Sequence, residues 1–282
     1  MQISRVAAIH DITGVGRCGL SVAVPVLSAL GHQVCPLPTA VLSTHPNRFE
    51  RPHMRALGED TVPILAHWAG EGLRFDAVYT GFMSGAEQIR AVAAGLARMR
   101  LSNGVVLVDP VLGDHGRLYG IVDDSMIDAM CMLAERADVI TPNLTEAYVL
   151  LGREYADKPC SREEAAALAA DLSAKYRTVC VVKGVPYEKG RRMNVMCEPQ
   201  SGQTAFVEYD MVPSNYPGTG DVFASLLLGV FLHTKDMREA FRAASRVTLN
   251  LVAHTYSQRT SPREGVLVEA FCPRMMEKCG LA

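Results

Sequence analysis

The sequence lacks the features that most directly mark a nucleic-acid-binding protein, a membrane protein or a zinc protein. Its 282 residues carry a formal net charge of −2, so no excess of positive charge predicts a nucleic-acid partner. No apolar run is long enough to span a bilayer, and we expect no membrane partner. The eight cysteines include no C-x-x-C pair, and with the histidines they show no zinc spacing, which argues against a zinc site.

We also expect no secretory signal. The first residues contain no basic segment followed by an apolar core, which is the pattern of a signal peptide. Cysteines scattered through a chain are typical of a protein whose thiols stay reduced. We therefore expect a cytoplasmic protein.

The common phosphate-binding motifs are absent too. The chain has no Gly-x-x-x-x-Gly-Lys-Ser/Thr segment and no protein-kinase glycine-rich or His-Arg-Asp loop, so neither mechanism is expected. Gly14, Gly16 and Gly19 formally match the Gly-x-Gly-x-x-Gly pattern of dinucleotide-binding folds. However, no acidic residue ends the next predicted strand, at Pro36 to Thr39, to bind a ribose hydroxyl, which weakens that interpretation.

What the sequence does contain is a regular alternation of short apolar runs and longer helical patterns. Hydrophobic residues make up 49% and charged residues 21% of the chain, an ordinary globular balance. The alternation predicts an α/β fold with a central, mostly parallel sheet and helices on both faces. The length fits a single domain over residues 1–282.

The expected elements follow from the period of the apolar residues. Strands are predicted at 6–9, 34–37, 76–79, 105–108, 137–140 and 178–182, and helices at 21–30, 60–72, 86–100, 125–135, 162–176, 222–233 and 236–254. Segments 193–197 and 204–211 predict a small β extension of the sheet, and a last strand is expected at 265–269.

The most informative segment is Gly218-Thr219-Gly220-Asp221, which is followed at once by an apolar run. Glycines permit a tight turn, and a helix that begins there presents free N–H groups and a positive dipole end to an anion. A carboxylate at such a site would repel phosphate, but it can accept the proton of a hydroxyl that attacks phosphate. The segment therefore indicates phosphoryl transfer to an alcohol, although Asp221 could equally be an N-cap.

Polar residues at the ends of the other predicted strands favour a site over a simple cap, because the carboxyl ends of parallel strands lie at one edge of a sheet. They are His10-Asp11, Thr80-Gly81-Phe82, Asp109-Pro110, Thr141-Pro142-Asn143 with Glu146, and Lys183-Gly184. Asp109, Asn143 and Glu146 offer the oxygen ligands that suit a hard cation such as Mg²⁺. Each could instead belong to a turn or a helix cap, and Asn143 could tie two loops together.

These segments resemble the pyridoxal kinases of the ribokinase-like superfamily along most of the chain. The resemblance lies in Gly16-x-x-Gly19, Pro36-Leu37, Ser43-Thr44-His45, Thr80-Gly81-Phe82, Asp109-Pro-Val-Leu-Gly-Asp114, Thr141-Pro-Asn-x-x-Glu146 and Gly218-Thr-Gly-Asp221. It implies a ribokinase-like fold and phosphorylation of the 5′-hydroxymethyl group of pyridoxal, pyridoxamine or pyridoxine by ATP. The family is typically dimeric, uses Mg²⁺, and is often assisted by a monovalent cation such as K⁺.

The resemblance also implies roles for individual residues. Asp221 would be the base, and the backbone of Gly218, Thr219 and Gly220 would form the anion hole with it. Asp109 and Glu146 would act through Mg²⁺. The remaining positions fall into two groups: Asp114, Tyr119, Thr141, Asn143 and Lys183 at the nucleotide, and Asp11, Ser43, His45 and Phe82 around the pyridine ring.

Some positions depart from the family pattern. Many relatives carry Ser in place of Asp11 and Tyr in place of Phe82, and Val41 and Pro46 replace polar residues. These changes fall on the vitamin pocket, so the sequence predicts the reaction type better than the alcohol. A hydroxymethylpyrimidine kinase of the same fold, or a non-catalytic vitamin-binding relative, remains an alternative.

Overall fold

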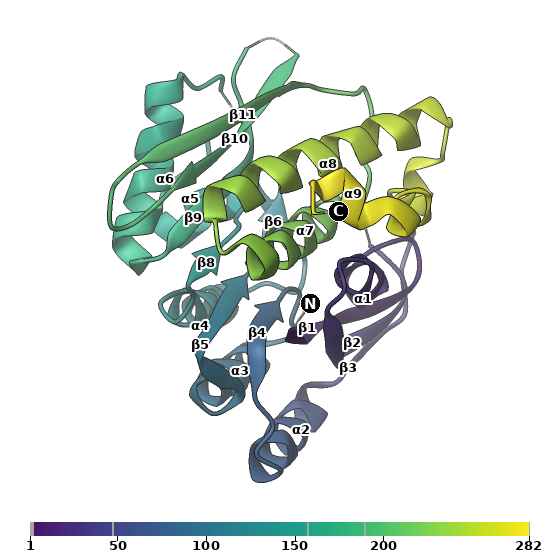
Figure 1. The fold of residues 1–282 in the computed structure, drawn as a ribbon, viewed down its shortest axis with the longest axis vertical. Helices are drawn as coiled ribbons and strands as arrows, with labels where there is room; N and C mark the ends of the chain where they lie inside the picture. The colour runs from purple at the N-terminus through teal and green to yellow at the C-terminus, as the bar shows by residue number, and fades with distance from the viewer. Residues whose placement is uncertain (1–2, 47, 157, 189, 282) are drawn as a thin grey trace.

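One nine-stranded sheet with helices on both faces forms the centre of the protein, in the part of the chain that the computed structural model describes, residues 3–46, 48–156, 158–188 and 190–281 (Figure 1). The strand order is β11-β10-β9-β8-β5-β4-β1-β2-β3. The strands are β1 (Arg5–Val15), β2 (Gln33–Thr44), β3 (Met54–Ala56), β4 (Phe75–Thr80), β5 (Arg100–Val108), β8 (Val139–Ile140), β9 (Val179–Pro186), β10 (Arg191–Cys197) and β11 (Thr204–Asp210).

The six strands from β2 to β9 in this order pair in parallel, and only β3, β10 and β11 are antiparallel to their neighbours. The predicted mostly parallel sheet with a small β extension is thus confirmed. Because the central strands are parallel, their carboxyl ends lie at one edge of the sheet.

Two hydrophobic cores separate the helices into two layers. One layer contains α2 (Gly58–Gly70), α3 (Ala86–Met99), α4 (Asp124–Ala134), α5 (Leu144–Leu151) and α6 (Arg162–Tyr176). The opposite layer contains α1 (Leu20–Ala29), α7 (Thr219–Thr234), α8 (Met237–Ser257) and α9 (Met275–Cys279). Figure 1 shows α7 and α8 running together across their face of the sheet. Since α7 is apolar on all sides and covered by α1 and α8, its start is held firmly against the sheet.

The element predictions hold with shifted ends, except at the C-terminus. Helix α6 has the predicted bounds, whereas β1 and β2 extend well beyond the four-residue apolar runs that predicted them. The strand expected at 265–269 is wrong: short 3₁₀ turns occupy Pro262–Glu264 and Val268–Ala270 instead. Proline at the start of the first turn favours a helical bend, and Val266 and Val268 are buried against the α7 and α8 core rather than paired in the sheet.

Strand β1 carries an irregularity at the edge where the site is expected. Its register against β2 shifts between His10 and Ile12, and its pairing with β4 ends at Ile9. Such a bulge redirects side chains at the point where it occurs. The end of β1 therefore leaves the regular sheet as it reaches the site.

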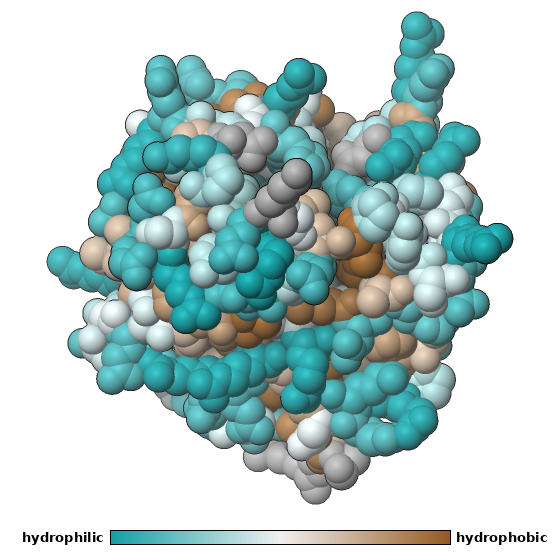
Figure 2. Space-filling view, turned by 90° about the horizontal axis from the view of Figure 1, so that it is seen from above, coloured by the Kyte–Doolittle hydropathy of each residue, from teal (hydrophilic) through white to brown (hydrophobic). Residues whose placement is uncertain are grey.

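The surface agrees with the composition. Figure 2, seen from above Figure 1, shows a largely hydrophilic face with hydrophobic residues visible in a furrow. Within the described ranges, no helix combines the length and the apolar character that a membrane crossing requires.

Candidate active site

The predicted strand-end segments meet at one edge of the sheet. Backbone hydrogen bonds join them in sequence across the strands: the N–H of Gly81 donates to Ile9, that of Asp109 to Thr80, that of Thr141 to Val108 and that of Lys183 to Pro142. The site is thus built on the backbone of five adjacent strands, which fixes the positions of its side chains.

The start of α7 faces this edge. Gly218 is the N-cap with φ of 82°, and no side chain caps the helix. A Cβ on Gly218 would lie 1.8 Å from the backbone oxygen of Arg17, so only glycine allows the loop before α1 to pack here. The first N–H groups of the helix, from Thr219 to Asp221, have no intrahelical acceptor. They form an anion site of the expected kind.

Asp221 lies at the centre of the site and is buried. Its Oδ2 accepts a hydrogen bond from the N–H of Gly19 at 2.9 Å. Its Oδ1 lies 3.1 Å from Nε2 of His10. Burial raises the pKa of Asp221, but the charge and hydrogen bond of His10 and the Gly19 N–H outweigh that effect and hold it below its usual value. The carboxylate is therefore ionised and fixed in orientation.

A second charged group lies beside the start of α7. Oδ1 of Asp109 accepts hydrogen bonds from Nζ of Lys183 at 2.7 Å and from the hydroxyl of Thr141 at 2.8 Å. Nζ of Lys183 is 3.4 Å from the position that a Cβ on Gly220 would occupy. Burial lowers the pKa of Lys183, yet the Asp109 and Glu146 carboxylates raise it overall. A permanent positive charge thus stands next to the anion site.

Glu146 completes a pair of buried carboxylates with Asp109, each 3% exposed. Its Oε2 accepts a hydrogen bond from the N–H of Asn143, and its Oε1 accepts one from Leu112. Burial and the nearby Asp109 carboxylate raise the pKa of Glu146 to about 8, although Lys183 opposes the shift.

The donor set around these carboxylates fits a magnesium ion. Among the residues that the structure describes, no cluster of three or more His, Cys, Asp or Glu side chains could enclose a metal. Mg²⁺, however, commonly binds through one or two carboxylates and keeps several waters. Oxygen donors whose mutual repulsion is only partly offset by one lysine suit such a cation.

A small hairpin, the flap, lies over this end of the site. It contains β6 (Gly113–Asp114) and β7 (Arg117–Leu118) and continues to Tyr119. Two contacts tie it to the start of α5: Nδ2 of Asn143 donates to the Gly113 carbonyl at 2.8 Å, and Thr145 Oγ1 accepts from the N–H of Gly116. The side chain of Asn143 is therefore used to cap α5 and to hold the flap.

Asp114 and Tyr119, the predicted nucleotide residues that lie in the flap, differ in their surroundings. Asp114 is half-buried and accepts a hydrogen bond from the N–H of His115. Burial, followed by the Glu146 and Asp114 carboxylates, raises the pKa of Tyr119. Tyr119 thus lies within electrostatic reach of the carboxylates, whereas Asp114 is directed into its own turn.

The residues expected around the pyridine ring do not form one continuous wall. His45 is buried, with Nε2 2.8 Å from the Arg263 carbonyl and Nδ1 unpaired among the described residues. Phe82 is half-buried beside His10. Ser43 instead is exposed and accepts a hydrogen bond from the N–H of His53 on the facing segment. Asp11 is buried and occupied on both oxygens, by His10 Nδ1 at 2.7 Å and the Thr13 hydroxyl at 2.6 Å.

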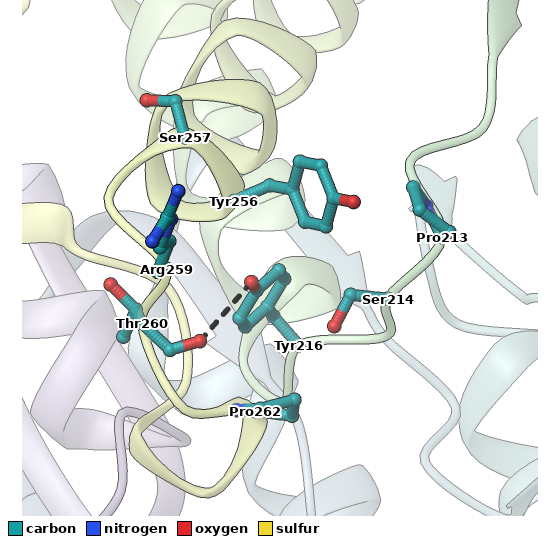
Figure 3. Close-up of a pocket in the computed structure, with 8 residues that line it drawn as sticks. All are labelled: Pro213, Ser214, Tyr216, Tyr256, Ser257, Arg259, Thr260 and Pro262. Atoms are coloured by element: carbon teal, nitrogen blue, oxygen red, sulfur yellow. Dashed lines mark hydrogen bonds between the residues drawn. The ribbon is translucent and has the colours of Figure 1, made fainter.

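A pocket of about 420 Å³ opens next to the start of α7 (Figure 3). Figure 3 shows Tyr216 and Tyr256 on its walls, with the Tyr216 hydroxyl donating to the Thr260 carbonyl at 3.3 Å. It is lined by Pro213, Ser214, Tyr216, Tyr256, Ser257, Arg259, Thr260 and Pro262. Sequence reasoning missed this pocket, because its walls come from two segments without a recognisable motif.

His10 is the second feature that sequence reasoning missed. Its position next to Asp11 at a predicted strand end indicated that it lies near the site, but it did not indicate what His10 does there. Only the fold brings it within hydrogen-bonding distance of Asp221, which lies 211 residues away in the chain.

The sequence profile of the phosphomethylpyrimidine kinase family matches residues 16–263. Among solved structures, a candidate phosphomethylpyrimidine kinase from Bacteroides thetaiotaomicron, in a crystal form with pyridoxal, is 35% identical with a TM-score of 0.91 and covers 97% of this chain and 96% of that chain. Pyridoxal kinase from Lactobacillus plantarum is 29% identical with a TM-score of 0.89 and covers 98% of each chain.

A curated relative points in the same direction. The pyridoxine/pyridoxal/pyridoxamine kinase of Bordetella bronchiseptica is 29% identical over 261 residues, which are 89% of this chain and 89% of that protein. The resemblance to pyridoxal kinases and the ribokinase-like fold are therefore confirmed. With its helix-start anion site and its match to the family profile over most of its length, the chain belongs to the phosphomethylpyrimidine kinase family.

Proposed function

We propose that this protein uses ATP to phosphorylate the 5′-hydroxymethyl group of a B6 vitamer, giving the 5′-phosphate and ADP. The observation that carries this proposal is the buried Asp221 carboxylate at the start of α7, next to Lys183 and to N–H groups that have no acceptor within the helix. A base and an anion cradle at one point are what phosphoryl transfer to an alcohol requires. The names of the relatives support a B6 vitamer as the alcohol.

Asp221 acts as the general base. The proton of the hydroxymethyl group passes to the carboxylate as the alcohol oxygen bonds to the γ-phosphorus, and the bond to the ADP oxygen breaks. Asp221 is ionised before the reaction because His10 and the Gly19 N–H stabilise the carboxylate. The N–H groups from Thr219 to Asp221 and the ammonium group of Lys183 stabilise negative charge on the phosphoryl group in transfer.

Asp109 and Glu146 hold Mg²⁺ in this proposal. When bound, the ion neutralises charge on the phosphate oxygens of ATP. Thr141 and Lys183 orient Asp109 through its Oδ1, and the backbone N–H groups of Asn143 and Leu112 orient Glu146. A monovalent cation such as K⁺ is also proposed, on the family resemblance alone. Removal of divalent ions with EDTA is expected to abolish turnover, and MgCl₂ to restore it.

The pocket beside Tyr216 is proposed to receive the adenosine of ATP. It lies directly before the helix start that would hold the phosphates, and two tyrosine rings line it. The flap reaches the same segment, since Nδ2 of Asn215 lies 3.2 Å from Nε2 of His115. Asp114, Tyr119 and Asn143 would then act at the nucleotide through the flap. Tyr256→Ala is expected to raise KM for ATP while leaving KM for the alcohol unchanged.

The vitamin is proposed to bind near His45 and Phe82, on the family resemblance. Nδ1 of His45 is buried there and has no hydrogen-bond partner among the described residues. Ser43 and Asp11 remain proposed substrate contacts from the family pattern, although both side chains have partners within the protein. The whole chain, residues 1–282, is proposed to act as one kinase domain, in the cytoplasm, where its eight free cysteines would stay reduced.

The second candidate function is hydroxymethylpyrimidine kinase, which the family name favours. An assay with ATP and pyridoxal, pyridoxamine, pyridoxine or hydroxymethylpyrimidine separates the two. We expect kcat/KM to be highest for one of the three B6 vitamers. A higher value for the pyrimidine would make the second candidate correct, and no turnover of any alcohol would indicate a non-catalytic relative.

A further inference from the structure

His10 links two carboxylates at the end of β1. Its Nδ1 lies 2.7 Å from Oδ1 of Asp11, and its Nε2 lies 3.1 Å from Oδ1 of Asp221. Two backbone N–H groups also lie near Nδ1, that of Asp11 at 2.9 Å and that of Phe82 at 3.3 Å. The contact from Nδ1 to the Asp11 carboxylate, at 2.7 Å, is shorter than either. An ionised carboxylate only accepts hydrogen bonds, so a ring that serves two of them donates from both nitrogens and carries a positive charge.

The space around this ring is shaped for it. A Cβ on Gly81 would lie 1.9 Å from Cδ2 of His10, and a Cβ on Gly19 would lie 2.6 Å from Oδ1 of Asp11. The side chain of His10 is 3% exposed. Since β1 leaves the regular sheet at this point, the ring and the carboxylate of the next residue both turn toward the interior. The arrangement is therefore enclosed, and the ring has little freedom to adopt another orientation.

Asp11 serves His10 rather than solvent. Its Oδ2 accepts a 2.6 Å hydrogen bond from the Thr13 hydroxyl. The backbone carbonyl of Thr13 in turn accepts a hydrogen bond from the Ser21 hydroxyl. With both oxygens engaged, Asp11 has the geometry of a residue that holds a charged imidazole in place.

We propose that Asp11 and His10 are positioning residues for the base: Asp11 holds His10, and His10 keeps the Asp221 carboxylate ionised and directed toward the alcohol. This role rests on the proposed function. It gives a role to His10, which the family resemblance did not implicate, and it gives Asp11 a role in supporting the base besides the proposed vitamin contact.

The charges around the ring are consistent with this role. Burial lowers the pKa of His10, but Asp221 and Asp11 outweigh it and raise the value to about 10. The other titratable groups that face the cluster are Tyr79 on β4, whose ring is 6.0 Å from that of His10, and Cys18 in the loop before α1. Burial raises the pKa of both. Both are therefore neutral, and Lys183 is the other cation near Asp221.

The kinetic test compares His10→Gln, Asp11→Asn and the wild-type protein across pH. Gln can still donate a hydrogen bond to Asp221 but carries no charge, so the acid limb of kcat/KM is expected to move up by about 1–3 pH units. A fall in kcat of about 10- to 100-fold at pH 6 is expected, with KM for ATP unchanged. His32→Gln is the matched control, because His32 is buried and bonded to the carbonyl of Gly229, which lies eight residues further along α7 than Asp221.

NMR spectroscopy measures the protonation state of His10 without any need for turnover. In the full-length protein with isotopically labelled histidine, the His10 resonances, identified by their loss in His10→Gln, are expected to stay in the imidazolium form from pH 6 to 9. In Asp11→Asn they should titrate within that range. A His10 ring that is neutral at pH 7 in the wild-type protein would overturn the proposal.

The outcomes separate the two levels of inference. If no alcohol is phosphorylated by the wild-type protein, or if Asp221→Ala keeps its activity, the proposed function or its base fails, while the spectra still decide the state of His10. If the wild-type protein is active, Asp221→Ala is inactive, and His10→Gln keeps the wild-type acid limb, the proposed role of His10 alone is wrong.

Discussion

At the scale of single residues, the site is a set of buried titratable groups that determine one another's charge. Asp221 and Asp11 flank His10, while Asp109 and Glu146 share one lysine. A buried charge is tolerated only when a partner or hydrogen bonds replace water. Removing one member of either set should therefore change both chemistry and stability, in directions that the contacts define.

Asp221→Asn tests the base directly. The amide keeps the shape of the side chain but cannot accept the proton of the alcohol, so kcat is expected to fall by about 10²- to 10⁴-fold. Binding of ATP and of the vitamin, measured by calorimetry, should remain largely intact. Near-normal kcat in this variant would remove Asp221 from the mechanism.

Glu146 should make stability depend on pH. Its pKa is raised from 4.5 to about 8 in the folded protein, first by burial, so it stays protonated where the unfolded chain is ionised. The unfolding free energy therefore falls as pH rises from about 4.5 to about 8. In metal-free buffer, the Tm of the wild-type protein should fall more steeply over this range than that of Glu146→Gln. Replacement of the exposed Glu135 by Gln should leave the slope of the wild-type protein unchanged.

At the scale of elements, the start of α7 and the loop before α1 form one unit. Gly218 touches the Arg17 carbonyl, and Gly19 donates to Asp221. The anion site is therefore shaped by a loop from the opposite end of the chain as much as by the helix itself.

Gly218→Ala should disrupt this unit. The added methyl group would overlap the Arg17 carbonyl, and the backbone has a positive φ, so a loss of stability of about 1–3 kcal/mol and a larger loss of kcat/KM are expected. Gly202→Ala is the control, because Gly202 also has a positive φ but meets no atom within 4 Å. Urea unfolding and turnover are measured for both variants. If both lose equal stability and activity, backbone strain, and not the packing of the loop before α1, causes the loss.

At the scale of the whole molecule, the outer ends of β1 and β2 leave an apolar surface. Ile12 and Val41 are register partners on the two strands, and with Val15 they are between 38% and 50% exposed. We propose that a second copy of the chain covers this surface in the homodimer that the family resemblance implies.

Val15→Asp should convert the dimer to a monomer. A charge in an apolar interface is costly, so sedimentation is expected to show a dimeric wild-type protein and a monomeric variant. Val62→Asp, at an exposed position on α2, should leave the dimer intact. A monomeric wild-type protein at micromolar concentration would contradict the proposal.

The chain order of the fold was predictable because apolar periodicity reports burial. The segment 162–176 begins with Ser161 and Glu164 in a capping box, and α6 has the expected bounds. The strand at 265–269 failed because a short apolar run does not distinguish a sheet strand from a buried turn. The prediction of where β1 and β2 end was wrong for another reason. The pairing of these ends depends on a partner strand and not on local composition.

The site was only partly predictable. Asp109, Thr141, Lys183 and Gly220 come together as their strand-end positions suggested. The hydrogen bond between His10 and Asp221 and the pocket at Tyr216 could not be predicted. Each depends on contacts between segments that are distant in the sequence, and no local sequence pattern reveals such contacts. Ser43 shows the opposite case: the family motif predicts a substrate contact, but its hydroxyl accepts a hydrogen bond from a neighbouring segment of the protein.

The bond between the N–H of Gly19 and Asp221 spans 202 residues of sequence. On the ribosome, the first strand emerges long before the helix that carries its partner. Until α7 is synthesised, the apolar face of the sheet against which it packs stays exposed. His10 then has Asp11 as a partner but not yet Asp221. The completed site is therefore a late product of translation, and a chain that stops just short of residue 221 would contain all nine strands of the described sheet but no base.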